Sequence, residues 1–149
     1  MSSGYLLDTS VLSMLAPDRP ALANDLSEWL RAHAGDLYFT AVAIAEIEQG
    51  ICKLRRAGGV ERAARLTEWL DALLANAADR VLPFDGGVGR IAGALSDQAR
   101  ATGRHPGFAD VAIAATAIAH DLVLLTRNAK HFEPLGVAFA DPLDGLLGE

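Results

Sequence analysis

The chain has 149 residues, enough for one domain with a sizeable core, and 51% of them are hydrophobic, which excludes an intrinsically disordered chain. No apolar stretch reaches the ~20 residues of a membrane-spanning helix, and the N-terminus does not resemble a signal peptide. The net charge of −6 argues against a scaffold that binds nucleic acid through an extended basic surface, but allows an enzyme whose acids hold cations. We therefore expect one cytoplasmic domain over residues 1–149, without membrane contact.

Short apolar runs alternate with helical segments along the whole chain. In chain order, the sequence predicts a strand at 4–8, helices at 9–15 and 21–34, a strand at 36–40, helices at 41–57 and 60–75, a strand at 80–84, helices at 86–102 and 108–119, and strands at 122–126 and 137–141. Thr40 and Asp85 are predicted to cap the helices that follow them, and Gly58 and Gly59 to end the helix before them.

Three of the predicted strands lack polar alternation, at residues 5–7, 122–125 and 137–140. Such strands are buried on both faces, which predicts an α/β fold: a three-layer α/β/α sandwich with a parallel sheet of four or five strands. Ligands of such sheets bind beyond the carboxyl ends of the strands. Asp8 stands at one such end, and Thr126, Arg127 and Asn128 follow another.

Four carboxylates are candidates for a site at this edge. Asp8 either faces the crevice or caps the next helix, a role that Thr9 could also take. Asp110 lies in the first turn of a helix that is apolar on nearly every face; the helix dipole favours an acid there, but a charge on a buried helix needs a partner. Glu46 and Glu48 flank one apolar stripe on opposite sides, and periodicity does not choose between them.

The ligand types predict the class of metal. Cys52 is the single cysteine, so the sequence offers no zinc knuckle; its helical surroundings predict a small, buried or half-buried thiol. Carboxylates that converge without a His–Cys cluster make an all-oxygen site, which suits Mg²⁺ or Mn²⁺. Such a site leaves room for a phosphate and favours metal-assisted phosphoryl chemistry.

Three segments resemble the PIN-domain ribonucleases: "LLDTSVLS" (6–13), "TAVAIAEIEQGI" (40–51) and "FADVAIAATAIAHDLVLLTRNAKHFEPLGV" (108–137). The VapC toxins of bacterial VapBC toxin–antitoxin pairs are the best match, and the FitB-like branch is close. The resemblance covers residues 5–142. It implies a single PIN-like domain that hydrolyses RNA phosphodiester bonds as a Mg²⁺-dependent (or Mn²⁺-dependent) endoribonuclease, and a cognate VapB-like antitoxin that inhibits it.

The resemblance, and not periodicity, selects Glu46 over Glu48. It implies that Asp8, Glu46 and Asp110 bind the metal, with Ser10 as a small hydroxyl residue near the first aspartate. Relatives often carry a further acid where Asn128 or His131 stands. Asn128 can still offer a carbonyl oxygen or hold a water at the metal, whereas His131 is expected to be a loop histidine. The number of metals therefore stays open.

The resemblance also implies partners. It predicts a homodimer, an antitoxin whose C-terminal segment lies along the toxin, and DNA contact only through the antitoxin. Apolar helices near 26–30 and 51–54 offer a groove or belong to the core. Because the net charge is negative, RNA contact is expected to be local, through the cation and through Arg127, Lys130 and Arg104.

Two alternatives to the ribonuclease remain. The first is a PIN-like dimeric partner of a DNA-binding antitoxin or repressor, with little or no nuclease activity. The second is another metal-dependent phosphoryl hydrolase on a doubly wound sheet. The glycine-rich segment at 86–90, "GGVGR", lacks the lysine and serine of a phosphate-binding P-loop and does not support this second alternative.

Overall fold

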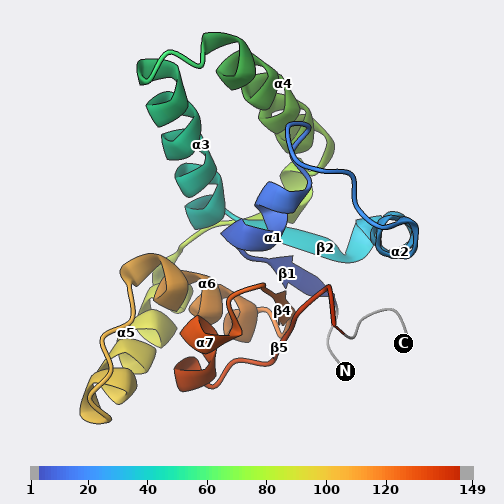
Figure 1. Ribbon diagram of the computed structural model, residues 1–149. Coiled ribbons are helices and arrows are strands. Elements are labelled where there is room, and N and C mark those ends of the chain that lie inside the picture. Colours follow the sequence, from blue (N-terminus) through green and yellow to red (C-terminus); the bar gives the residue numbers. More distant parts are fainter. Residues whose placement is uncertain (1–3, 145–149) are drawn as a thin grey trace.

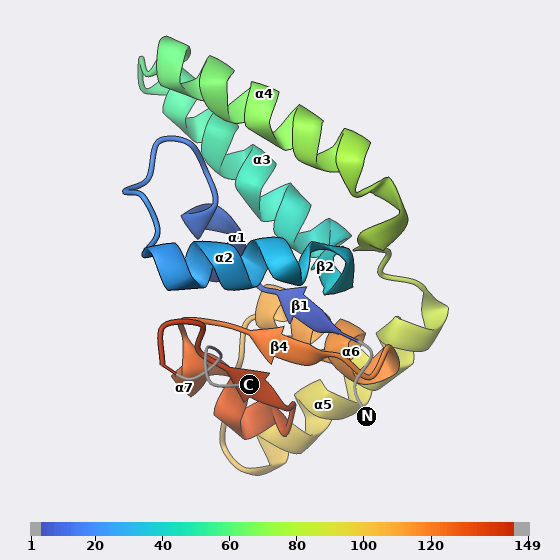
Figure 2. The same cartoon turned by 90° about the vertical axis from the view of Figure 1, so that its right-hand side faces the viewer.

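The computed structural model describes residues 4–144, which form a sheet between two layers of helices (Figures 1 and 2). The five strands in this range are β1 (Tyr5–Leu7), β2 (Leu37–Thr40), β3 (Val81–Leu82), β4 (Val123–Leu125) and β5 (Phe139–Ala140). The seven α-helices in the same range are α1 (Thr9–Met14), α2 (Asn24–Ala32), α3 (Ala41–Arg56), α4 (Val60–Asn76), α5 (Gly86–Ala101), α6 (Phe108–Ala119) and α7 (Ala129–Phe132).

The strands make one sheet in the order β3-β2-β1-β4-β5, and every neighbouring pair is parallel. The predicted three-layer α/β/α sandwich with a parallel sheet is therefore confirmed. The central strand β1 pairs with β2 on one side and β4 on the other. Since all strands run the same way, their carboxyl ends share one edge of the sheet.

Alternate residues of each strand serve the two helical layers, because successive side chains in a strand point to opposite faces. Leu6 packs with residues of α5 and α6, whereas Leu7 packs with residues of α1, α2 and α3. Figure 1 shows α5, α6 and α7 on one side of the sheet and α1 to α4 on the other. The sheet is thus covered on both faces, as its lack of polar alternation predicts.

Helix α6 is buried over most of its length, as expected from its composition. Its residues 111–117 are at most 3% exposed, and Ala112, Ala114, Ala115 and Ala117 are fully buried. Thr116, also buried, donates its hydroxyl to the carbonyl of Ala112 and so needs no partner outside the helix. Small side chains on every face let α6 pack tightly between α5 and the sheet.

The predicted caps of α3 and α5 are present, since Thr40 accepts from the Ala43 N–H and Asp85 from the Val88 N–H. Two further expectations, on the start of one helix and on the burial of Cys52, are wrong. Helix α2 begins at Asn24 rather than at residue 21; Asp25 in its first turn accepts from the free Leu26 N–H. Cys52 is exposed rather than buried, because it lies on the outer face of α3.

No helix in residues 4–144 has both the length and the apolar character needed to cross a membrane.

Candidate active site

A hollow of about 500 Å³ opens at the carboxyl edge of the sheet, and we call it the acid hollow. Its lining residues are Asp8, Thr9, Ser10, Ser13, Glu46, Gly107, Ala109, Asp110, Ile113, Asn128 and His131. They lie in α1, α3, α6 and α7 or directly precede α1, α6 and α7, and Asp8 is also the residue that follows β1. The structure therefore brings Asp8, Glu46, Asp110 and Asn128 together around one cavity.

Asp8 is 3% exposed and accepts three hydrogen bonds. Its Oδ1 accepts from the Val11 N–H at 2.9 Å and from the Ser10 hydroxyl at 2.6 Å, and its Oδ2 accepts from the Thr126 hydroxyl at 2.6 Å. The bond from Val11 caps α1, so Asp8 fills both roles that the sequence left open. Three donors offset the cost of burying the carboxylate and fix its orientation.

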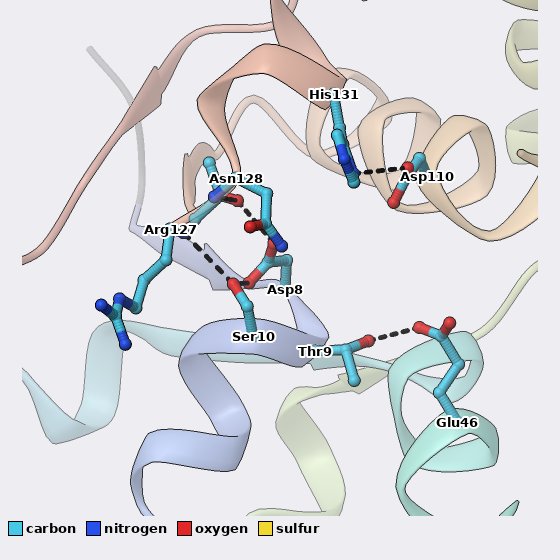
Figure 3. A network of polar contacts seen from close by, with 9 residues as sticks. Asp8, Thr9, Ser10, Glu46, Asp110, Arg127, Asn128 and His131 are labelled. Carbon is cyan, nitrogen blue, oxygen red and sulfur yellow. Dashed lines mark hydrogen bonds and ion pairs between the residues drawn. The ribbon is translucent and has the colours of Figure 1, made fainter. Parts of the chain in front are cut away.

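The donors to Asp8 also tie together the chain segments that follow β1 and β4 (Figure 3). Thr126 is fully buried and accepts from the Asn128 N–H at 2.9 Å, while the Ser10 hydroxyl accepts from the Arg127 N–H at 3.2 Å. Thr126 was not among the predicted site residues. The available signal was its position, since a hydroxyl side chain directly follows the apolar strand β4.

The side chain of Glu46 lines the acid hollow and that of Glu48 does not. Glu46 accepts a hydrogen bond from the Thr9 hydroxyl, which turns its carboxylate toward α1 (Figure 3). Glu48 instead accepts from the thiol of Cys52, one turn further along the exposed side of α3. This geometry agrees with Glu46 as the glutamate of the site. Thr9 also belongs to the site, because it lines the hollow and donates to Glu46, whereas the sequence predicted for it only a possible role as a helix cap.

The side chain of Asp110 is 32% exposed, and its Oδ2 lies 3.2 Å from Nδ1 of His131. Burial is the main reason that the pKa of the Asp110 carboxyl is raised; the His131 ring opposes the shift, and the negative charges of Glu46 and Asp8 add to it. His131 is therefore not a plain loop residue, because it lies in α7 and pairs with an acid of the hollow.

The expected convergence of the three carboxylates on a single point is not present in this conformation. No three His, Cys, Asp or Glu side chains within residues 4–144 are grouped so that they could hold a metal ion. The reason is visible in Figure 3, where Glu46 is bound to Thr9 and Asp110 to His131. The donor chemistry still fits a hard cation, because three carboxylates and an amide line one hollow and the acids repel one another.

Asp110→Asn should stabilise the metal-free protein at pH 7. A raised pKa means that the ionised form of Asp110 destabilises the fold relative to its protonated form. The free energy of unfolding therefore decreases as the pH rises through the pKa of Asp110 in the folded protein. Since the side chain is about one-third exposed and water screens its charge, we expect only a small rise in the melting temperature, at about 2–4 °C for each ~1 kcal/mol gained in a chain of this size. Thermal melts in EDTA would measure it, and the gain should fade as the pH approaches 3.8.

The matched control for this change is Asp97→Asn, which removes one negative charge from the exposed side of α5. If Asp110→Asn melts no higher than Asp97→Asn at pH 7, the acids of the hollow do not destabilise the fold.

The sequence is similar to known proteins over most of its length. A sequence model of the PIN domain matches residues 5–135. The chain is 36% identical to the VapC ribonuclease Y4jK of Sinorhizobium fredii and 33% identical to the toxin FitB of Neisseria gonorrhoeae; each match covers 92% of this chain and 96% of the relative.

Solved structures of similar proteins have the same fold as this chain. The crystal structure of FitAcB from Neisseria gonorrhoeae contains a chain that is 33% identical and superposes with a TM-score of 0.82, over 95% of this chain and 99% of that one. In the structure of FitAB bound to an IR36 DNA fragment, the identity is 31% and the TM-score 0.80, over 95% and 97% of the two chains. The chain thus belongs to the PIN-domain family.

Proposed function

We propose that this protein is the toxin of a toxin–antitoxin pair and acts as a metal-dependent endoribonuclease. The observation that carries the proposal is the acid hollow, in which Asp8, Glu46 and Asp110 surround one cavity at the carboxyl edge of a parallel sheet. A relative named as a VapC ribonuclease, similar over nearly the full length of both chains, supports the same activity.

The cofactor that fits the hollow is Mg²⁺ or Mn²⁺, held by Asp8, Glu46 and Asp110, with Asn128 as a further oxygen donor. When bound, such a cation polarises the phosphodiester and makes water a stronger nucleophile at neutral pH. The raised pKa of Asp110 supports this ligand set, because the repulsion from Glu46 and Asp8 that contributes to it is what a cation would relieve.

The remaining residues of the site orient these ligands and meet the substrate. Ser10 and Thr126 donate to different oxygens of Asp8 and so hold its carboxylate in one position. A further hollow beside Asp110 is lined by Arg104 and Lys130, together with His131. The positively charged side chains of Arg104 and Lys130 would offer local contacts to RNA phosphates, as expected for a protein with net charge −6.

The decisive experiment is incubation of the purified protein, freed from its antitoxin, with total RNA in the presence of Mg²⁺ or Mn²⁺ and in EDTA. Cleavage that requires the divalent metal supports the proposal, and sequencing the products would give the cleavage site. Absence of cleavage with either metal, together with DNA binding by the complex with its antitoxin, would favour a dimeric repressor partner instead. The solved FitAB–DNA complex makes that second outcome worth measuring.

The antitoxin has a suitable surface in the groove between α1, α3 and α4. This groove has a mainly apolar lining that includes Ile47, Ile51, Leu54, Leu66 and Trp69, and it reaches the acid hollow at Thr9 and Glu46. We propose that the C-terminal segment of a VapB-like antitoxin lies here, on a homodimer of the toxin, and that DNA is bound only through the antitoxin. Leu26, the other apolar candidate, does not line this groove.

Asn128→Asp should tighten Mg²⁺ binding by roughly tenfold, because it adds a fourth carboxylate to the hollow and so one more charge-assisted contact with the cation. Isothermal titration of Mg²⁺ into wild type and variant would measure the effect. Asn76→Asp at the end of α4 is the control, since it adds the same charge outside the hollow. Equal affinities for the two variants would remove Asn128 from the metal site.

A further inference from the structure

A second hollow, of about 550 Å³, adjoins the acid hollow and shares Ser10, Ser13 and Asn128 with it. We call it the arginine hollow, because its lining contains Arg19 and Arg127 but no aspartate or glutamate. This charge pattern is unusual for the molecule, which has 19 acidic residues against 13 lysines and arginines. An anionic ligand is therefore favoured here and disfavoured over most of the surface.

Both arginines are available for a ligand. The ion pairs within residues 4–144 join Arg62 to Asp18, Arg80 to Asp79 and His131 to Asp110, so neither arginine of the hollow takes part in one. The backbone of Arg127 is fixed by its N–H bond to the Ser10 hydroxyl, while its side chain extends away from the carboxylates (Figure 3). An arginine whose backbone is fixed, and whose guanidinium makes no ion pair within the described residues, is suited to bind a phosphate.

The rest of the lining is largely apolar and includes Met14, Leu22, Leu26 and Leu143. Leu143 is 53% exposed, one of few large hydrophobic side chains left at the surface of the described residues. Apolar walls combined with a few polar groups are typical of small-molecule sites, and the volume is in their usual range. The combination of two cations with an apolar wall matches a nucleotide, which has an anionic phosphate and a flat, apolar base face.

We propose that the arginine hollow is a subsite for the nucleotide next to the cleaved phosphodiester of single-stranded RNA. Its phosphate would lie between Arg19 and Arg127 and its base against Leu22 and Leu143. The adjoining acid hollow receives the cleaved phosphodiester, so this inference rests on the proposed ribonuclease activity. An unpaired strand is favoured, because a base inside a duplex would first have to unpair and leave its stack to enter the hollow.

The test uses binding rather than cleavage, in an Asp8→Asn background that does not turn over the probe. The probe is a fluorescein-labelled, mixed-sequence octaribonucleotide, with anisotropy recorded over a salt series at constant Mg²⁺. Arg19→Gln and Arg127→Gln should each weaken binding about 5- to 10-fold, the effect of one lost phosphate contact, and should each reduce the salt slope by ~0.7. Leu143→Ser should weaken binding about threefold and leave the slope unchanged, because it removes no charge.

Arg31→Gln is the control, since it removes the same charge from α2 at a position that lines neither hollow. The proposal is overturned if the two hollow arginines behave like Arg31, or if the octamer in a perfect duplex binds as tightly as the single strand. If the Arg19 and Arg127 variants behave like the Arg31 variant while the wild-type protein cleaves RNA, the subsite is wrong and the proposed ribonuclease activity is still supported. If the wild-type protein cleaves no RNA, the proposed function itself fails. Loss of antitoxin binding with unchanged RNA binding would assign the hollow to the protein partner.

Discussion

Asp8→Asn should reduce the rate of RNA cleavage by roughly a thousandfold or more while the protein stays folded. The change removes one negative charge from the proposed cation site. It keeps a side-chain oxygen that can accept from the Val11 N–H, and asparagine caps helices as well as aspartate does. Initial rates on single-stranded RNA in Mg²⁺, together with thermal melts, would measure the two effects separately.

Asp8→Ala should behave differently, because it removes every acceptor that Asp8 offers to Ser10, Val11 and Thr126. We expect it to lose activity and also about 1–2 kcal/mol of stability through the lost cap of α1. The matched control for Asp8→Asn is Asp85→Asn, which makes the same change at the cap of α5, outside the hollow, and should keep the wild-type rate. A wild-type rate for Asp8→Asn in Mg²⁺ would disprove the mechanism.

Thr126→Val should cause the second large effect, a 10- to 100-fold loss of cleavage, which is typical when a group that orients a metal ligand is removed. Valine has nearly the same shape as threonine but cannot donate to Asp8 Oδ2 or accept from the Asn128 N–H. Two buried or half-buried polar groups then lose a partner, at a cost of about 1–3 kcal/mol each when no water replaces it. Cleavage rates and chemical denaturation would measure both losses.

Thr116→Val is the control for this change. Thr116 is equally buried, but its hydroxyl donates only to the Ala112 carbonyl within α6, so the variant should cleave RNA normally. Thr126→Ser keeps the hydroxyl and should restore most of the activity. If Thr126→Val and Thr116→Val cleave at the same rate, the bond from Thr126 does not orient Asp8 for catalysis.

The layers of this fold are predictable because the pattern of buried residues leaves little choice. Helix α6 was expected over residues 108–119 and occupies that range, since alanine favours a helix and neither glycine nor proline interrupts it. Strands β1 and β4 are apolar on both faces, and only a central position in a parallel sheet buries both. The start of α2 was less predictable, because the alanines at 21 and 23 are compatible with helix or loop.

The side-chain contacts of the site could not be predicted in the same way. Asp8 and Thr126 are 118 residues apart in sequence, and their hydrogen bond depends on the register of β1 against β4. Helical periodicity did not choose between Glu46 and Glu48 and, if anything, placed Glu48 nearer the apolar stripe, so the choice of Glu46 needed the family resemblance. The contact between His131 and Asp110 depends on the short helix α7, whose four residues carry too little periodicity to predict.

The position of β1 at the centre of the sheet has a consequence for how the protein is made. The hydrogen-bond partner of Asp8, Thr126, is synthesised 118 residues after it, which takes roughly 6–24 s at ~5–20 residues per second. Until then β1 lacks its neighbour β4, and the carboxylate of Asp8 lacks one of its donors. A chain that ends before Thr126 therefore has no complete site, and a cell that translates this message is exposed to the nuclease only after synthesis has passed β4 and Thr126.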